Sequence, residues 1–298
     1  VSNAVTDFTP SGVDSFSLGG HGATNQNGYS IVAWCWKLGG EPTADNSAGV
    51  GATPTSGSVK IDGSNKSDAL AGTIAATRLS ANTQSGVSIV TYTGNGSDGA
   101  TIAHGLSTAP ETVIVFGRDI ANTTVLGTTG QITGFTHYIS YAKNTSYWVD
   151  DDTIWNDTAP TSTVFSVGTA ANVNTNTKKY LAICMHHVDG FSRVGEISYA
   201  GNGSSTAGTF VHCGFKPAFV MVKRADSSSG WQVYDHLRTS NNSASDNERQ
   251  YNPRDERLAL NTTNVLATSS TQAMDFASSG FRLRSNNTDQ NGGSVPYF

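Results

Sequence analysis

The sequence has few charged residues, no long apolar run and only three cysteines. Charged side chains make up 14% of its 298 residues, whereas about 25% is usual in soluble proteins. The net charge is −5, which argues against a protein that binds the phosphate backbone of nucleic acids. No apolar run reaches the roughly 18 residues of a membrane-spanning helix, and no basic segment precedes an apolar one as in a signal peptide. We therefore expect neither nucleic-acid binding nor membrane insertion.

The cysteine count excludes a disulfide framework. Cys35, Cys184 and Cys213 are an odd number of thiols, and disulfide-stabilised domains use paired cysteines. They are predicted to be buried free thiols in a protein assembled in a reducing cytoplasm.

Neutral polar residues take the place of charge. The chain has 35 Ser, 36 Thr, 23 Asn and 32 Gly, and it is poorer in Ala, Leu, Glu and Lys than a helical protein would be. Apolar residues make up 37% of the sequence and are spread along all of it. That is enough to fill the thin cores of β-sandwiches, and it is not the composition of a disordered chain.

A segment of about 107 residues occurs twice. Residues 90–97 (VTYTGNGS) match residues 197–204 (ISYAGNGS), and residues 110–115 (PETVIV) match residues 217–222 (PAFVMV) at the same offset. Self-similarity at a fixed spacing is typical of repeated structural units. The sequence therefore predicts two repeats, residues 87–192 and 193–298.

The end of this unit occurs a third time, near the N-terminus. Residues 16–18 (FSL), an Asn-rich turn and residues 29–35 (YSIVAWC) resemble the ends of both repeats. Residues 1–40 are thus predicted to be the end of a preceding unit, and residues 41–86 a Gly/Ser/Thr-rich linker or long loop with one hairpin near 59–63. Either the chain is a segment of a longer repetitive polypeptide with a truncated second repeat, or residues 1–40 donate strands to a neighbouring unit.

Local patterns predict strands throughout. Residues 87–92 alternate with period two, and residues 112–116 and 218–223 are apolar, β-rich runs after a proline. Asn95-Gly96 and Asn202-Gly203 favour type I′ hairpin turns. Residues 94–99 also fit G-x-G-x-x-G, but no helix that could meet a pyrophosphate follows them. These signals predict tandem antiparallel β-sandwiches, jelly-roll-like in architecture.

These motifs resemble a known family. Residues 88–96 (SIVTYTGNG), 104–106 (HGL), 156–168 (NDTAPTSTVFSVG), 180–184 (YLAIC), 251–253 (YNP) and 258–261 (LALN) are similar to an uncharacterised repeat of tail-fibre and other structural proteins of marine tailed bacteriophages, cyanophages among them. The resemblance covers nearly the whole chain. It implies a virion protein on the tail or head surface, assembled in the host cytoplasm, and it supplies no catalytic residues.

Three clusters are candidate sites of metal binding or anion binding. Asp150, Asp151 and Asp152 could hold Ca²⁺, although a solvated acidic loop is the simpler interpretation. Neighbouring strand residues point to opposite faces, which opposes zinc binding by Cys184, His186 and His187. A basic segment of the second repeat contains Arg249, Arg254 and Arg257. We interpret it as a salt-bridged loop, with a site for an anionic surface polymer as the alternative. We expect no metal and no cofactor.

The large aromatic residues are the remaining candidates for contacts. Trp34 and Trp36 would share one face of a strand and are predicted to lie in the core or at a subunit interface. Tyr147 and Trp148 lie beside the acidic loop and are predicted to be exposed. The predicted contacts to a ligand or receptor are these two residues and two further tryptophans, Trp155 and Trp231.

The primary functional hypothesis is a non-enzymatic virion structural protein. It would be a segment of a tail fibre or spike, most simply a homotrimer bound to other virion proteins, that presents loops to a glycan or protein receptor on the host. The alternatives are a head-decoration protein and a carbohydrate-binding or carbohydrate-active protein. No nucleophile elbow, P-loop or H-E-x-x-H is present, but the 23 acidic residues leave a glycosidase pair open.

Overall fold

The computed structural model divides into two compact units, Val1–Lys37 and Leu38–Phe298. The described residues are 8–10, 15–19, 27, 33–130, 134–141, 148–202, 207–224, 230–237, 252, 256–260, 267–268, 272–285 and 292–297. The first unit contains the antiparallel pair β1 (Phe8–Pro10) and β2 (Phe16–Leu18). Apart from this pair, the predicted end of a preceding repeat falls largely outside the described residues.

The first repeat and residues 59–82, which precede it, together form a nine-stranded sheet in the second unit. In spatial order its strands are β11 (Val149–Asp150), β10 (His137–Ser140), β9 (Val125–Thr128), β8 (Thr112–Gly117), β13 (Lys179–Met185), β6 (Val87–Thr93), β5 (Ala76–Asn82), β3 (Val59–Ile61) and β4 (Ser64–Asn65). All neighbours are antiparallel except β3 and β5. The alternating residues 87–92 and the apolar residues 112–116 form β6 and β8, as predicted.

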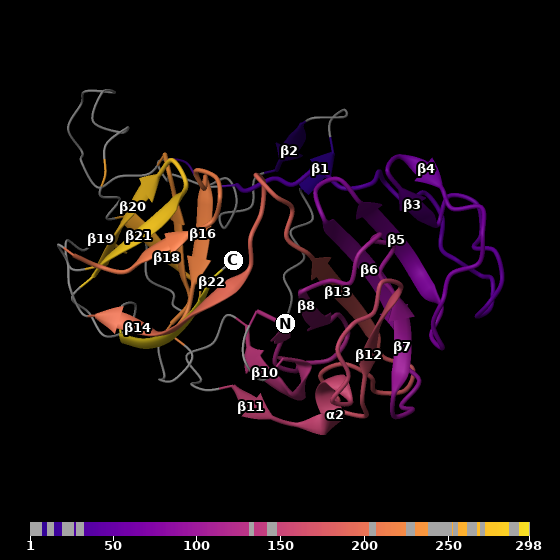
Figure 1. Cartoon of the computed structure of the whole chain (residues 1–298). Coiled ribbons are helices and arrows are strands. Elements are labelled where there is room, and N and C mark those ends of the chain that lie inside the picture. Colours follow the sequence, from indigo (N-terminus) through magenta and orange to yellow (C-terminus); the bar gives the residue numbers. More distant parts are fainter. Residues whose placement is uncertain are drawn as a thin grey trace. The chain divides into compact units, whose positions relative to one another are not determined.

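A second layer covers one face of this sheet (Figure 1). It consists of the antiparallel pair β7 (Ala100–Ala103) and β12 (Val164–Val167), with the short helix α2 (Asp152–Trp155) and the 3-10 turn η1 (Gly134–Thr136) beside it. The core lies between the layers. There Tyr92 of β6 stacks on Tyr180 of β13 with a centroid distance of 5.3 Å, and its ring edge meets Phe165 of β12 at 6.2 Å.

The second repeat has its own core between two sheets. The larger sheet contains, in spatial order, β14 (Gly195–Asn202), β22 (Gly292–Tyr297), β16 (Phe219–Val222), β17 (Gln232–Asp235), β18 (Glu256–Ala259) and β19 (Ala267–Thr268). The smaller sheet contains β15 (Phe210–His212), β21 (Gly280–Ser285) and β20 (Gln272–Ala277). The apolar residues 218–223 thus supply the central strand β16. With several antiparallel sheets and one four-residue α-helix among the described residues, the all-β sandwich prediction is confirmed.

The two repeats have the same strand order. The order β6-β13-β8-β9-β10-β11 in the first sheet corresponds, strand by strand along the chain, to β14-β22-β16-β17-β18-β19 in the second. The covering pair β7 and β12 corresponds to β15 and β21. The 107-residue repeat in the sequence therefore has a topological counterpart in the structure.

Residues 41–58 form a long loop, but residues 59–82 contribute β3, β4 and β5 to the large sheet, so the interpretation of residues 41–86 as a linker or loop throughout is corrected. The predicted hairpin near 59–63 is present as β3 and β4. However, β5 pairs with β6 along its whole length, and β3 pairs with β5. Leu79 and Ala81 of β5 are fully buried in the core. The segment was misjudged because its apolar residues are few and small, although they alternate with polar ones as in any half-buried strand.

The two repeats contact each other through the outer faces of their large sheets. The Trp231 indole Nε1 donates a hydrogen bond to the Ser140 carbonyl at 3.1 Å, and its ring centroid lies 5.3 Å from that of Tyr141. Tyr141 also reaches the Met221 sulfur at 3.9 Å. Met221 pairs with Val233 across β16 and β17, and both are buried outside the core of their own sandwich. The outer face of the second sheet therefore packs against the end of β10.

The loop at residues 94–99 is not a hairpin turn, contrary to the prediction from Asn95-Gly96. The strands on either side of it do not pair with each other, because β6 lies in the large sheet and β7 pairs with β12. The loop crosses between the layers and is held by Asn174, whose side chain accepts from Asn95 N at 2.9 Å and donates to Ser97 O at 2.8 Å. Gly94 passes so close that an added Cβ would lie 2.4 Å from the Thr175 carbonyl oxygen.

We expect Asn174→Ala to lower the free energy of unfolding by about 1–3 kcal/mol, because buried backbone groups of this crossover would lose their partners. Asn174 is fully buried, and its amide also donates to Gly168 O at 3.0 Å. Urea-induced unfolding followed by circular dichroism measures the change. The control is Asn176→Ala, at an exposed asparagine two residues away. Equal urea midpoints for the two variants would show that Asn174 does not hold the loop.

Candidate functional site

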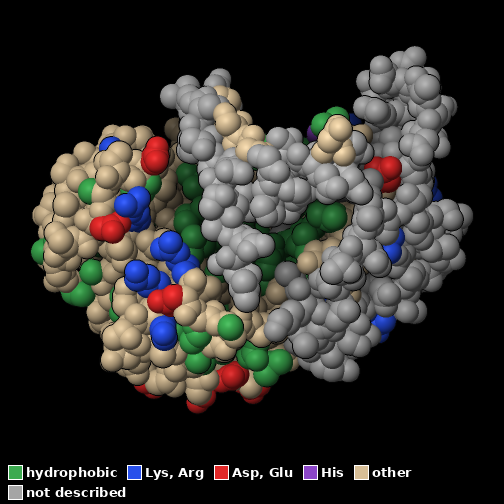
Figure 2. Space-filling model, turned by 180° about the vertical axis from the view of Figure 1, so that it is seen from behind, with side chains coloured by type: hydrophobic (Ala, Val, Ile, Leu, Met, Phe, Trp, Pro, Cys, Tyr) green, Lys and Arg blue, Asp and Glu red, His purple; other side chains and the backbone are tan. Residues whose placement is uncertain are grey.

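An open trough of about 500 Å³ lies on the outer face of the nine-stranded sheet, away from the second layer. Its floor is formed by outward-facing residues of β5, β6 and β13, and its lining residues are Asp45, Thr77, Arg78, Thr91, Tyr92, Thr93, Arg118, Lys179 and Leu181. The side chain of Tyr92 points the other way, into the core. Figure 2, which views the molecule from this side, shows Lys and Arg side chains close together with a few acidic side chains among them.

A β-bulge in β5 places Arg78 in the trough. Ala76 pairs with Tyr92 and faces the core, and the register then shifts so that Arg78 pairs with Thr91 on the outer face. The extra residue, Thr77, also lines the trough. The Thr91 hydroxyl accepts a hydrogen bond from Arg78 N at 3.1 Å, which secures the irregular backbone. A bulge thus redirects a charged side chain within an otherwise regular sheet.

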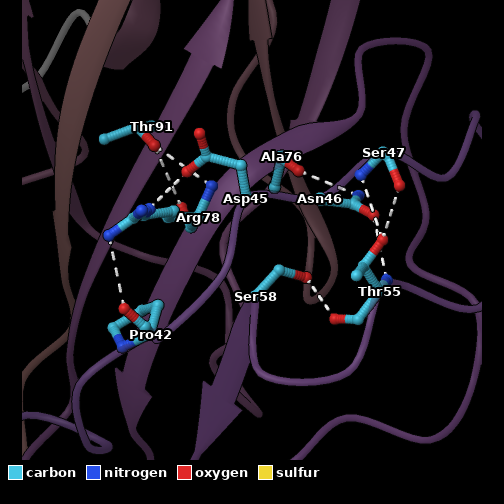
Figure 3. Close-up of polar contacts among 9 residues, drawn as sticks. All are labelled: Pro42, Asp45, Asn46, Ser47, Thr55, Ser58, Ala76, Arg78 and Thr91. Carbon is cyan, nitrogen blue, oxygen red and sulfur yellow. Dashed lines mark hydrogen bonds and ion pairs between the residues drawn. The ribbon is translucent and has the colours of Figure 1, made fainter.

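Residues 42–46 lie over this bulge and bring Asp45 into the lining of the trough (Figure 3). The Asn46 backbone N–H donates to Thr77 O at 2.8 Å, and its side-chain amide donates to Ala76 O at 3.0 Å. The Asn46 side-chain oxygen accepts from Ala48 N and Thr55 N, each at 3.0 Å, and so closes the segment on itself. Asp45 is thereby fixed beside the Arg78 guanidinium, with which it forms an ion pair.

The trough carries a net positive charge. Three cations line it, Arg78, Arg118 and Lys179, against the single carboxylate of Asp45. The Arg78 guanidinium also donates to Pro42 O at 3.3 Å. Arg118 and Lys179 are exposed, and among the described residues neither side chain has an ion pair or hydrogen bond. The neighbouring Asp119 uses one carboxylate oxygen to accept from Lys179 N at 2.8 Å. Two basic side chains therefore remain available to an anion.

The buried groups beneath the trough are uncharged. Burial raises the pKa of the Tyr92 hydroxyl well above its usual value, with a smaller contribution from Tyr180, and this hydroxyl donates to Val173 O at 2.8 Å. Burial likewise raises the pKa of the Cys184 thiol to about 12, so this cysteine is an inert core residue. The charge of the site thus comes from its exposed side chains alone.

Two tryptophans predicted to contact a ligand are buried instead, which corrects that prediction. Trp155 has no exposed surface and packs edge-on against Phe135 at 5.3 Å in the first core. Trp231 is also fully buried, against Tyr141 of the other repeat. A large aromatic ring gains more from burial than from exposure, and both rings are used to fix layers of the fold.

The remaining predicted aromatic contacts are spread over the chain. Tyr147 lies outside the described residues, and Trp148 is half-buried before β11. Trp34 and Trp36 lie in the first unit in a segment without strand structure, so they do not share a strand face; Trp34 is half-buried and Trp36 is 55% exposed. Cys35 between them is exposed, contrary to the prediction of a buried thiol, whereas Cys184 and Cys213 are buried.

The acidic run has a structural role. Asp151 is the N-cap of α2, and its carboxylate accepts from Thr153 N at 3.0 Å and from the Thr153 hydroxyl at 2.6 Å. Asp152 is the first residue of this helix, and Asp150 belongs to the edge strand β11. In the part of the chain that the structure describes, no group of three His, Cys, Asp or Glu residues is arranged to hold a metal ion.

The basic segment of the second repeat is only partly described. Arg249 and Arg254 lie outside the described residues. The Arg257 guanidinium donates to the Gln232 side-chain oxygen at 2.6 Å, across β18 and β17. Basic side chains do line a cavity at the trough over β5, β6 and β13. Sequence reasoning missed it because Asp45, Arg78, Arg118 and Lys179 come from four separate segments.

Comparison with known proteins places the chain in a family. A family model described as a domain of unknown function (DUF7483) matches residues 58–298. The chain belongs to the DUF7483 family. The DUF7483 match spans both repeats and begins just before β3, so it includes all the trough residues except Asp45. No match is found among curated proteins or among solved structures. Of the described helices, none has the length and apolar character needed to cross a membrane.

Proposed function

We propose that this DUF7483 chain is a non-enzymatic structural segment of a bacteriophage virion, in a tail fibre or spike, that attaches to the host-cell surface. The resemblance of residues 88–96, 156–168 and 180–184 to repeats of phage structural proteins motivates the virion assignment. In the virion the segment would bind other structural proteins and associate as a homotrimer, which multiplies weak host contacts into avidity.

The observation that carries the attachment role is the division of the outer face of the first sheet. At β10 this face packs against the second repeat through Trp231 and Tyr141. Over β5, β6 and β13 it remains open as the trough. A fibre segment needs both properties, a firm contact between consecutive units and an accessible surface for the receptor.

The trough also favours a second candidate function, that of a carbohydrate-binding protein outside a virion.

Attachment can be tested with the fluorescently labelled chain on a panel of marine bacterial cultures that includes cyanobacteria. We expect saturable binding to some strains, and we expect the unlabelled chain to reduce adsorption of a phage that infects those strains. Binding to purified phage capsids without binding to any cells would overturn the proposal in favour of a head-decoration protein. Release of soluble sugar from cell-surface polysaccharide would overturn its non-enzymatic part.

A further inference from the structure

We infer that the trough over β5, β6 and β13 binds an acidic polysaccharide, held through its carboxylate or sulfate groups. This inference rests on the proposed role in attachment and names the chemistry of the receptor. Two features of the trough support it: its cations, of which Arg118 and Lys179 are unpaired among the described residues, and its row of hydroxyl groups.

The cations suit repeated anionic groups. Arg118 follows β8 and Lys179 begins β13, and the Arg118 N–H donates to the Lys179 carbonyl at 2.8 Å, so their backbones are held together. Arg78 lies on β5, on the far side of β6 from β13. Since neighbouring strands lie about 4.8 Å apart, the basic residues on the two sides of β6 are separated by roughly two strand spacings. A polymer that carries one anion on each of successive units can bind Arg118 and Lys179 and extend across β6 toward Arg78, which is already paired with Asp45.

The hydroxyl groups suit a sugar. Thr77, Thr91 and Thr93 line the trough between the cations, and Leu181 adds a small apolar surface beside them. Thr91 and Thr93 are two residues apart on β6 and therefore project from the same face. The Thr91 hydroxyl is partly used by the bulge, whereas no described residue bonds to the Thr93 hydroxyl. Hydroxyls that both donate and accept match the hydroxyls of a sugar ring.

The lack of exposed aromatic rings in the trough and the negative charge of the surrounding chain disfavour nucleic acid as the occupant. Single strands are bound by aromatic side chains on which the bases stack, and the one aromatic residue along the trough, Tyr92, is turned into the core. Residues 1–192, which contain the trough, also have fourteen acidic against eight basic side chains. A net negative chain around a small positive trough opposes a long phosphate backbone more than it opposes a local contact with an acidic sugar.

Binding is measured by biolayer interferometry with the full chain and three immobilised probes. Polygalacturonate supplies carboxylates, dextran sulfate supplies sulfates, and dextran is neutral. We expect binding to at least one of the two acidic polymers and none to dextran. The difference between the acidic polymers identifies which anion the trough prefers. Equal binding to all three, or binding to none, would overturn the inference.

Charge reversal in the trough separates a built site from general attraction between charges. We expect Arg118→Glu and Lys179→Glu each to weaken binding at least tenfold; both side chains are exposed, so the fold is retained. Lys216→Glu, at an exposed lysine of the second repeat, makes the same change in net charge and is expected to have no effect. Thr93→Val, which removes only a hydroxyl, is expected to weaken binding several-fold. Equal effects of Lys179→Glu and Lys216→Glu would show that the trough is not the site.

This inference and the proposed function can fail separately. If the labelled chain attaches to cells, and Arg118→Glu and Lys179→Glu attach equally well, then the trough is not the receptor site while the attachment role stands. If the chain binds an acidic polymer through the trough but attaches to no cell and blocks no phage, the virion role is overturned and the polysaccharide site stands.

Discussion

Replacement of Trp231 by Ala is expected to lower the free energy of unfolding by about 3–5 kcal/mol, as for other fully buried tryptophans. Its side chain has no exposed surface, and it contacts Tyr141 and the Ser140 carbonyl of the other repeat. The substitution would therefore leave a cavity between the two outer sheet faces and remove the partner of that carbonyl. Urea-induced unfolding followed by far-ultraviolet circular dichroism measures the loss.

Two further variants identify which part of the Trp231 contact matters. Trp231→Phe keeps most of the ring and removes the indole N–H, so we expect a loss of about 1 kcal/mol from the hydrogen bond, with a smaller addition from the lost volume. Trp36→Ala removes the same type of side chain where it is 55% exposed, and we expect a change within about 0.5 kcal/mol. If Trp231→Ala were as stable as Trp36→Ala, the contact between the two repeats would not contribute to stability, and the repeats would unfold as independent domains.

The tryptophans also show where sequence reasoning stops. A tryptophan that packs in a core and one that binds a sugar at the surface are the same residue type. Nothing in the sequence next to Trp155 and Trp231 distinguishes these two roles. Trp155 is buried because Asp151 caps a single helical turn that directs it into the core. Asp151 is also part of the sequence-based candidate for a Ca²⁺ site, because a carboxylate that caps a helix and one that binds a cation cannot be distinguished in a sequence.

The repeat was predictable because two copies of one pattern support each other. The offset between residues 110–115 and 217–222 indicated equivalent strands, and β8 and β16 occupy the same place in their sheets. The turn at Asn95-Gly96 was predicted wrongly, because a two-residue signal says only that the chain turns. It does not say which strand follows in space, and the loop is held by Asn174, which lies 79 residues from Asn95 in the sequence.

The trough could not be found from the sequence for a related reason. Arg78 would face the core in a regular strand that continued the alternation of Ala76, and the bulge at Thr77 moves it to the outer face. Asp45 lies 33 residues before Arg78, in a segment that reads as a loop. Lys179 and Arg118 come together only because β13 and β8 are neighbours. A regular strand pattern predicts which residues share a face, but a bulge or a long-range pairing does not appear in it.

The free energy of unfolding is also expected to fall in acid because of His104, a buried residue that directly follows β7. His104 has no exposed surface. Its Nε2 contacts Thr161 O at 3.1 Å, and its Nδ1 accepts from Leu106 N at 3.1 Å. The Leu106 contact requires an unprotonated Nδ1, and the Thr161 contact then requires a proton on Nε2. The fold therefore holds the neutral ring in one tautomer.

Burial lowers the pKa of His104 from 6.5 to about 4, outweighing the Thr161 carbonyl, which raises it. Between these two values the unfolded chain binds a proton at this residue and the folded chain does not, so stability decreases as the pH falls. The contribution is complete above pH 6.5 and is lost by about pH 4. A difference of this size corresponds to about 3 kcal/mol, a large part of the stability of a typical domain.

The variant His104→Asn isolates this contribution, because an asparagine oxygen can accept from the N–H two residues later and does not titrate. We expect the wild type to lose about 3 kcal/mol more than His104→Asn between pH 7 and pH 4, measured by urea unfolding at half-unit steps. His212→Asn, at an exposed histidine, is expected to keep the wild-type dependence. Parallel stability curves for the wild type and His104→Asn would mean that the buried ring accepts a proton without cost. In that case the two contacts at Thr161 and Leu106 would not fix its neutral form.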